Sequence, residues 1–164
     1  MLSQELVSRA EFLLEQLRKS GFKITTAESC TGGLVAALFT EIPGSSDVFE
    51  RGFITYSNEA KHELLGVSQQ TLDKYGAVSQ ETAEAMASGA LNASRADIAL
   101  SITGVAGPGG GSAEKPVGLV HFGSFSRHKG TVHRKHLFGD LGRHIIRKKS
   151  CEVAFDLLSL HLDN

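Results

Sequence analysis

Apolar residues recur at helical spacing near both ends of the chain. At the start, positions 6, 10, 13, 14 and 17 are leucine or alanine at steps of three and four. This pattern predicts a helix over 6–17, with Gly21 placed where a C-terminal cap belongs. A second helix is expected over 140–162, with an inner face made of Ile145, Ile146, Val153, Ala154, Leu157 and Leu158.

Between these ends, short β-branched or apolar segments alternate with helical ones. Strands are expected over 22–27, 51–57 and 97–103, and a hairpin over 117–125 and 131–138. Helices are expected over 32–40, 58–66, 68–76 and 79–94. This order favours an α/β fold, a three-layer α/β/α sandwich with a mixed sheet. No repeat or linker interrupts it, so residues 1–164 are expected to form a single domain.

Charge and composition narrow the class of protein. The 164 residues carry 17 Lys and Arg against 18 Asp and Glu, and 41% of them are hydrophobic. A balanced charge gives no field that attracts nucleic acid, and no apolar run reaches the ~20 residues that cross a bilayer. The first residues show no signal-peptide pattern, and the two cysteines form no C-x-x-C motif. We therefore expect a cytoplasmic protein without a nucleic-acid or membrane partner.

Glycine is unusually frequent, at 18 of 164 residues, against about 7% in an average protein. Glycines and hydroxyl residues gather at 28–33, 43–46 and 103–112, next to the ends of predicted elements. In α/β folds, ligands bind in the crevice at the strand ends. The long loop 104–116 is neither a P-loop, because Gly110 replaces the required lysine, nor a dinucleotide fingerprint. It is therefore either a backbone cradle for a phosphate or a flexible connection.

The segment 22–40 places a serine between a strand and a helix. Ser29 would point its hydroxyl into the crevice, beside helical N–H groups that can hold an oxyanion or a phosphate. Two alternatives remain open from the residues alone. Ser29 or Thr31 could merely cap the helix. Cys30 is a rival nucleophile, because a thiolate is intrinsically more nucleophilic.

A serine nucleophile needs a base, and Lys61 is the best candidate. It falls in the first turn of the helix that follows Tyr56, where the helix dipole lowers the pKa of a cation. If it is also buried near Ser29, it is neutral and can accept a proton; the alternative is a solvated surface lysine. No histidine spacing suggests zinc, and most of the seven are expected to be surface residues: His62, His121, His128, His133, His136, His144 and His161.

Four blocks of sequence resemble a known family. TTAESCTGG (25–33), PGSS with FERGFITYSNEAK (43–61), YGAVS (75–79) and SITGVAGPGGGSAEKPVG (101–118) are similar to CinA C-terminal domains. The resemblance covers about residues 5–160. It implies an amidohydrolase that converts nicotinamide mononucleotide to nicotinic acid mononucleotide and ammonia, without a metal or another cofactor. It also implies a homo-oligomer, with a dimer favoured.

The resemblance also assigns roles to individual residues. Ser29 matches the nucleophile, Lys61 the base and Tyr56 the partner of this pair. The substrate contacts that it implies are Thr31, Gly32, Gly44, Ser45, Thr103, Gly104 and Arg143. Two residues inserted after Gly139-Asp140 leave open whether Arg143 or Arg147 reaches the phosphate. The alternative function is a nucleotide-binding regulatory module of the same fold without turnover.

Overall fold

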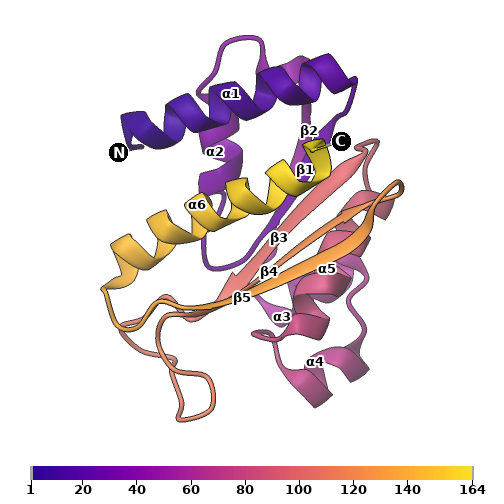
Figure 1. Cartoon of the computed structure of the whole chain (residues 1–164). Coiled ribbons are helices and arrows are strands. Elements are labelled where there is room, and N and C mark those ends of the chain that lie inside the picture. The colour runs from indigo at the N-terminus through magenta and orange to yellow at the C-terminus, as the bar shows by residue number, and fades with distance from the viewer. Residues whose placement is uncertain (1, 164) are drawn as a thin grey trace.

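The computed structural model describes residues 2–163 and contains six α-helices, one 3₁₀ helix and five strands in these residues. Helices and strands alternate over most of the chain, as expected (Figure 1). In chain order the elements are α1 (Gln4–Ser20), β1 (Ile24–Glu28), α2 (Leu34–Thr40), η1 (Ser45–Asp47), β2 (Phe49–Ile54), α3 (Asn58–Leu65), α4 (Gln69–Tyr75), α5 (Gln80–Asn92), β3 (Ile98–Gly104), β4 (Leu119–Ser126), β5 (Gly130–Leu137) and α6 (Arg143–Leu162).

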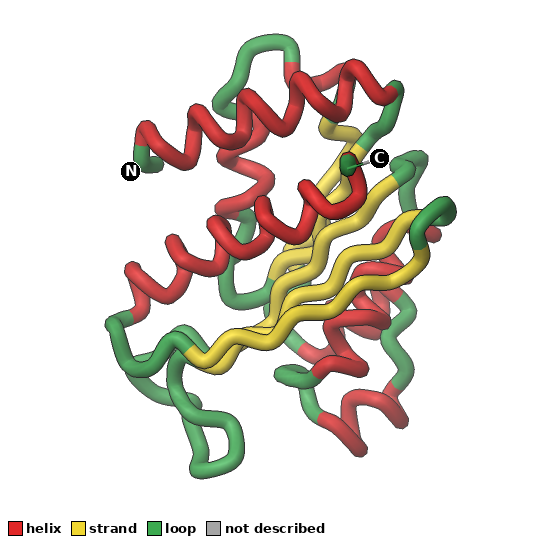
Figure 2. The backbone as a smooth tube through the Cα atoms, viewed as in Figure 1, coloured by secondary structure: helices red, strands yellow, loops and turns green. Residues whose placement is uncertain are grey.

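The five strands form one mixed sheet in the order β2-β1-β3-β4-β5. β1 runs parallel to β2 and β3, whereas β4 is antiparallel to β3 and β5. Helices α1, α2 and α6 cover one face, and α5 with α3 and α4 covers the other (Figures 1 and 2). The predicted three-layer α/β/α sandwich with a mixed sheet is confirmed.

The inner strands β1 and β3 explain why helices must cover both faces of the sheet. All five residues of β1 are buried, and β3 is buried along nearly its whole length. On one side Leu38, Phe39 and Phe155 pack in the larger core cluster. On the other side Met86 and Leu91 of α5 belong to a second cluster. Burying this apolar surface, at about 25 cal/mol per Å², is the main force that holds the three layers together.

Local signals set most of the element boundaries. The Ser3 hydroxyl accepts a hydrogen bond from the N–H of Leu6 at the start of α1. Gly21, with φ of 71°, ends the helix by donating to the carbonyls of Leu17 and Arg18. Such a left-handed cap suits glycine, which has no Cβ to clash. The predicted first helix and its cap are therefore confirmed.

Two of the differences from the predicted boundaries concern Tyr56 and the last helix. β2 ends at Ile54, so Tyr56 lies beyond the strand rather than at its end. The last helix begins at Arg143, and Ile145 is 45% exposed instead of lying on the inner face. Successive helical residues point about 100° apart, and here the neighbouring Ile146 takes the buried position.

No helix within residues 2–163 combines the length and apolar character needed to cross a membrane.

Candidate active site

A small cavity lies where the carboxyl ends of neighbouring strands meet. Glu28, the last residue of β1, pairs with Ile54 of β2 and Ile102 of β3, so the residues that follow these positions share one edge of the sheet. The cavity measures about 180 Å³. It is lined by Ser29, Cys30, Tyr56, Lys61, Ala77, Val78, Thr103, Gly104, Ala106 and Arg143, and we call it the Ser29 cavity.

The amine of Lys61 lies at the floor of the Ser29 cavity. Its Nζ is 3.0 Å from Ser29 Oγ and donates to the Thr55 carbonyl at 2.7 Å. The lysine is only 1% exposed, so the interpretation as a solvated surface residue is wrong. Burial lowers the pKa of Lys61 because the ammonium form loses its hydration. A lysine in this state can accept a proton from the adjacent hydroxyl.

The turn from β1 to α2, residues 28–33, forms an elbow in which the Ser29 hydroxyl contacts Lys61 and not the start of α2. α2 begins after Gly33 and has no side-chain cap from its N-cap residue. Instead, the Glu28 carboxylate accepts hydrogen bonds from the N–H groups of Val35 and Ala36, at 2.9 and 3.0 Å. The capping interpretation of Ser29 and Thr31 is therefore wrong. Glu28 was not among the predicted site residues, because it lies five residues before the N-cap Gly33, outside the positions where a capping side chain is normally sought.

Two glycines let the elbow turn sharply. Gly32 and Gly33 have φ of 57° and 98°, in the left-handed region that side chains rarely adopt. A Cβ on Gly33 would also lie 3.0 Å from Ile54 Cδ1. The glycine pair thus brings α2 close behind Ser29.

Cys30 is placed differently from Ser29. It lines the Ser29 cavity but belongs to the hydrophobic core, whereas the Ser29 hydroxyl contacts Lys61 Nζ. Burial raises the pKa of the Cys30 thiol to about 12. A thiol with such a pKa is protonated near neutral pH, and the protonated form is a poor nucleophile.

The two candidate arginines of α6 lie in different surroundings. Arg143 lines the Ser29 cavity and donates to the Tyr56 hydroxyl at 2.8 Å and to the Gly107 carbonyl at 2.9 Å. Arg147 donates to the carbonyls of Cys30 and Thr31, both at 3.1 Å. Arg143 therefore faces the cavity together with Tyr56, whereas Arg147 holds the elbow by hydrogen bonds to its backbone carbonyls.

The remaining predicted contacts near the elbow are placed as follows. Thr103 and Gly104 line the cavity, and the Thr103 hydroxyl donates to the Ala77 carbonyl at 2.7 Å. A Cβ on Gly104 would lie 2.8 Å from the Leu119 carbonyl oxygen, so the strand requires glycine there. Thr31 and Gly32 belong to the elbow, and the Thr31 side chain is fully buried.

Gly44 and Ser45 lie away from the other predicted residues. They precede β2, at the end of the sheet where the Ile24 N–H donates to the Val48 carbonyl. Ser29 follows the opposite end of β1, which is five residues long. A strand rises about 3.3 Å per residue, so one chain does not bring this turn into the Ser29 cavity.

Most of the seven histidines were expected on the surface, and two of the seven, His121 and His161, are buried. The His121 Nδ1 lies 2.9 Å from His133 Nε2, and His161 lies between the hydroxyls of Ser124 and Ser126, at 2.6 and 2.8 Å. Burial lowers the pKa values of His121 and His161 to about 4. Among residues 2–163 there is no group of three His, Cys, Asp or Glu side chains that could hold a metal ion.

Comparison with known proteins identifies the family. The family model described as CinA C-terminal domain matches residues 7–162. The chain belongs to the CinA C-terminal domain family. Within it, the chain is 48% identical over 159 residues to the nicotinamide-nucleotide amidohydrolase PncC of Escherichia coli K12, covering 96% of this chain and 95% of that protein.

Other members of the CinA C-terminal domain family differ in length. The chain is 51% identical to the CinA-like protein of Kosmotoga olearia over 92% of its own length, but spans only 36% of that protein. Among solved structures, the competence/damage inducible protein CihA of Agrobacterium tumefaciens is 46% identical, with a TM-score of 0.96 over 100% of this chain and 99% of that one. The resemblance noted in the sequence is thus confirmed at the level of the family and the fold.

Proposed function

We propose that this chain is a nicotinamide-nucleotide amidohydrolase, which hydrolyses the carboxamide of nicotinamide mononucleotide to a carboxylate and ammonia. Similarity to the E. coli PncC protein over nearly its full length supports the substrate class. The observation that carries the proposal is the buried contact between Lys61 and Ser29 within a cavity. This pair has the two parts of a serine hydrolase, a hydroxyl and an adjacent base.

The proposed reaction begins with neutral Lys61. Its Nζ takes the proton of Ser29 while Oγ attacks the carboxamide carbon, which forms a tetrahedral intermediate. Lys61 then returns this proton, directly or through Tyr56, to the amide nitrogen. The C–N bond breaks, ammonia departs, and the acyl group remains bound to Ser29 as an ester. Water, activated by the same lysine, hydrolyses the ester and restores the serine hydroxyl. The net change is amide plus water to acid plus ammonia.

Backbone N–H groups of the elbow are the proposed donors to the oxyanion. The N–H groups of Ser29 and Gly32 are already bonded to the carbonyls of Ile102 and Ser29. Those of Cys30 and Thr31 have no backbone acceptor within residues 2–163. Fixed donors of this kind contribute about 3 kcal/mol each to transition-state binding. The Thr103 hydroxyl already donates to the Ala77 carbonyl, so we assign it no hydrogen bond to the oxyanion. Thr103 then only lines the cavity.

The substrate is proposed to enter with its ring first. At about 180 Å³ the Ser29 cavity lies below the usual range of about 300–1,000 Å³ for ligand pockets, so it holds only part of a nucleotide. The 5′-phosphate is assigned to Arg143, whose charge would give a preference for the nucleotide over free nicotinamide. Tyr56, 62% exposed and bonded to Arg143, also lines the cavity.

We also propose a homodimer in which the Gly44–Ser45 turn of a second copy completes the site. The support is that the turn lies at the opposite end of β1 from Ser29, while the cavity of one chain is too small for the whole substrate. Light scattering is expected to give twice the chain mass. Ser45→Ala is expected to raise KM for the nucleotide with little change in kcat. A monomer with full activity would contradict this part.

The activity itself is tested by ammonia release from nicotinamide mononucleotide, nicotinamide and the nicotinamide dinucleotide in parallel. We expect turnover of the mononucleotide, much weaker turnover of free nicotinamide, and no effect of a chelator. Tight binding of the mononucleotide without ammonia at high protein concentration would instead favour the regulatory module. Loss of activity with chelator would contradict a metal-free reaction.

A further inference from the structure

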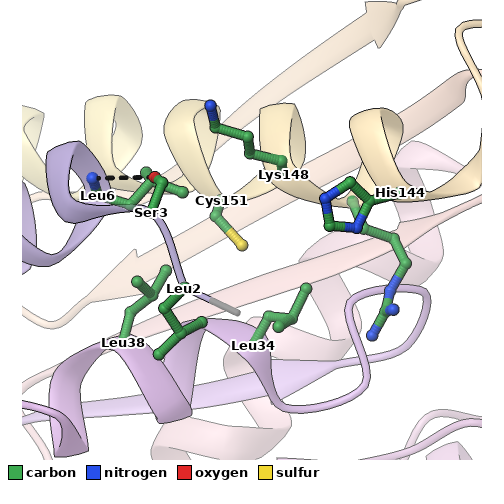
Figure 3. Close-up of a pocket in the computed structure, with 9 residues that line it drawn as sticks. Leu2, Ser3, Leu6, Leu34, Leu38, His144, Lys148 and Cys151 are labelled. Carbon is green, nitrogen blue, oxygen red and sulfur yellow. Dashed lines mark hydrogen bonds between the residues drawn. The ribbon is translucent and has the colours of Figure 1, made fainter.

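A second and larger cavity, of about 340 Å³, lies between α1, α2 and α6 (Figure 3). No residue that lines it also lines the Ser29 cavity. Its apolar wall comes from Leu2, just before α1, from Leu6 in the first turn of α1, and from Leu34 and Leu38 of α2. The sulfur of Cys151 points from α6 into this space (Figure 3). We call it the α1–α2–α6 cavity.

Three nitrogen-bearing side chains of α6 line the other side of this cavity. His144, Arg147 and Lys148 are three and four residues apart, so they share one face of the helix. None of the ion pairs found among residues 2–163 uses any of them. The first turn of α6 contains no acidic residue. The N-terminus of the 17-residue α1 also faces the cavity through its cap, Ser3. Both helix starts add partial positive charge.

We propose that the α1–α2–α6 cavity is a second ligand site that binds a small molecule with an apolar body and one anionic group, of the medium-chain carboxylate type. The leucine wall would remove the apolar body from water, and the basic edge of α6 would pair with the anion. The volume falls within the range of about 300–1,000 Å³ that is usual for ligand pockets.

Arg147 contacts both this second site and the elbow. It lines the α1–α2–α6 cavity and also donates to the carbonyls of Cys30 and Thr31, directly after Ser29. The proposal concerns binding, and binding by calorimetry is measured whether or not the chain turns over a nucleotide. Its failure and a failure of the proposed function are therefore distinguishable.

The test compares octanoate with octanamide, which has the same chain length but no charge. Titration calorimetry on the whole chain is expected to give saturable binding of octanoate with one site per chain, and at least tenfold weaker binding of octanamide. Lys148→Gln combined with His144→Gln is expected to weaken octanoate at least tenfold and to leave octanamide unchanged.

Variants that fill the cavity provide the matched control. Leu34→Trp is expected to abolish octanoate binding, whereas Phe12→Trp, at a side chain exposed elsewhere, is expected to bind as the wild type does. Leu2→Trp, near the chain start, repeats the test if Leu34→Trp fails to fold. No saturable binding, equal binding of octanamide, or unchanged binding in the filled variants would each overturn the proposal.

Discussion

Lys61 and Ser29 are 32 residues apart in the sequence, and their side chains meet at 3.0 Å in a buried contact. The contact arises because α3 follows β2, which runs parallel to β1, so the start of α3 reaches the end of β1. None of the ion pairs among residues 2–163 includes this lysine. A buried amine without a carboxylate partner favours its neutral form, which is the form a base requires.

The pH dependence of the reaction is expected to report Lys61. Because burial lowers the pKa of this amine, kcat/KM should rise with pH through an apparent pKa below the ordinary lysine value of about 10.4. Lys61→Met, which keeps the length but removes the base, should lower kcat at least ~10³-fold. A pH–rate series of the wild type and turnover of the variant check both. A rising limb at or above pH 10.4 would contradict the assignment.

Replacing Arg143 is expected to separate binding of the phosphate from chemistry. Arg143→Gln should raise KM for nicotinamide mononucleotide about 10- to 100-fold, because it removes one charge-assisted contact. Nicotinamide riboside, which lacks the phosphate, is the control and should be affected far less. Steady-state kinetics on both substrates measure this difference. An equal loss of kcat/KM on both substrates would assign Arg143 to the chemical step instead of phosphate binding.

The same kinetics on Arg147→Gln should give a different result. Since Arg147 holds the two carbonyls that follow Ser29, its loss should lower kcat on both substrates by a similar factor. Arg147→Lys, which keeps the charge but has one donor centre, should restore activity only in part. A KM effect confined to the phosphorylated substrate would show that Arg147, not Arg143, reaches the phosphate.

Close packing of α3 on α5 is expected to be essential for placing Lys61. A Cβ on Gly89 of α5 would lie 1.9 Å from the carbonyl oxygen of Leu65, the last residue of α3. Gly89→Ala should therefore lower the free energy of unfolding by about 1–3 kcal/mol. At an exposed helix position the same substitution would raise the stability, because alanine has the higher helix propensity. It should also lower kcat. Gly109→Ala, where nothing lies within 4 Å, is the control for thermal unfolding.

Stability in mild acid is expected to depend on His161. Its pKa is lowered to about 4, so the unfolded chain binds a proton below about pH 6.5 that the folded chain does not. Stability should fall as pH drops from 6.5 to 4, by on the order of 3 kcal/mol from this group. His161→Gln should show a smaller fall in denaturant titrations over the same range. Equal slopes for the two proteins would contradict the prediction.

The sequence was sufficient to predict the layers and most elements because local signals agreed with the fold. The helix period before Gly21 and the apolar run at 97–103 correspond to α1 and β3. The boundary at Ile54 was less predictable, because the strand ends where its neighbour β1 ends, and sequence alone does not contain that pairing.

The candidate site was predictable in kind but not in arrangement. Its place in the first turn of a helix and the family resemblance both pointed to Lys61, but its burial could not be predicted. That burial depends on α3 packing against α5, which no local pattern encodes. For the same reason the sequence left Arg143 and Arg147 as alternatives, since the fold alone places one at the cavity and the other behind the elbow. The sequence did not show which histidines are buried, because their partners, such as Ser124 for His161, lie far away in the chain.

The measurement that tests the central claim most directly is a single-turnover assay of ammonia release from nicotinamide mononucleotide by Ser29→Ala and Cys30→Ala. If Ser29 is the nucleophile, Ser29→Ala should lose at least ~10³-fold in rate. Cys30→Ala should stay within about tenfold of the wild type, because its thiol is protonated and packed in the core. Unchanged release by Ser29→Ala, with loss in Cys30→Ala, would contradict the account.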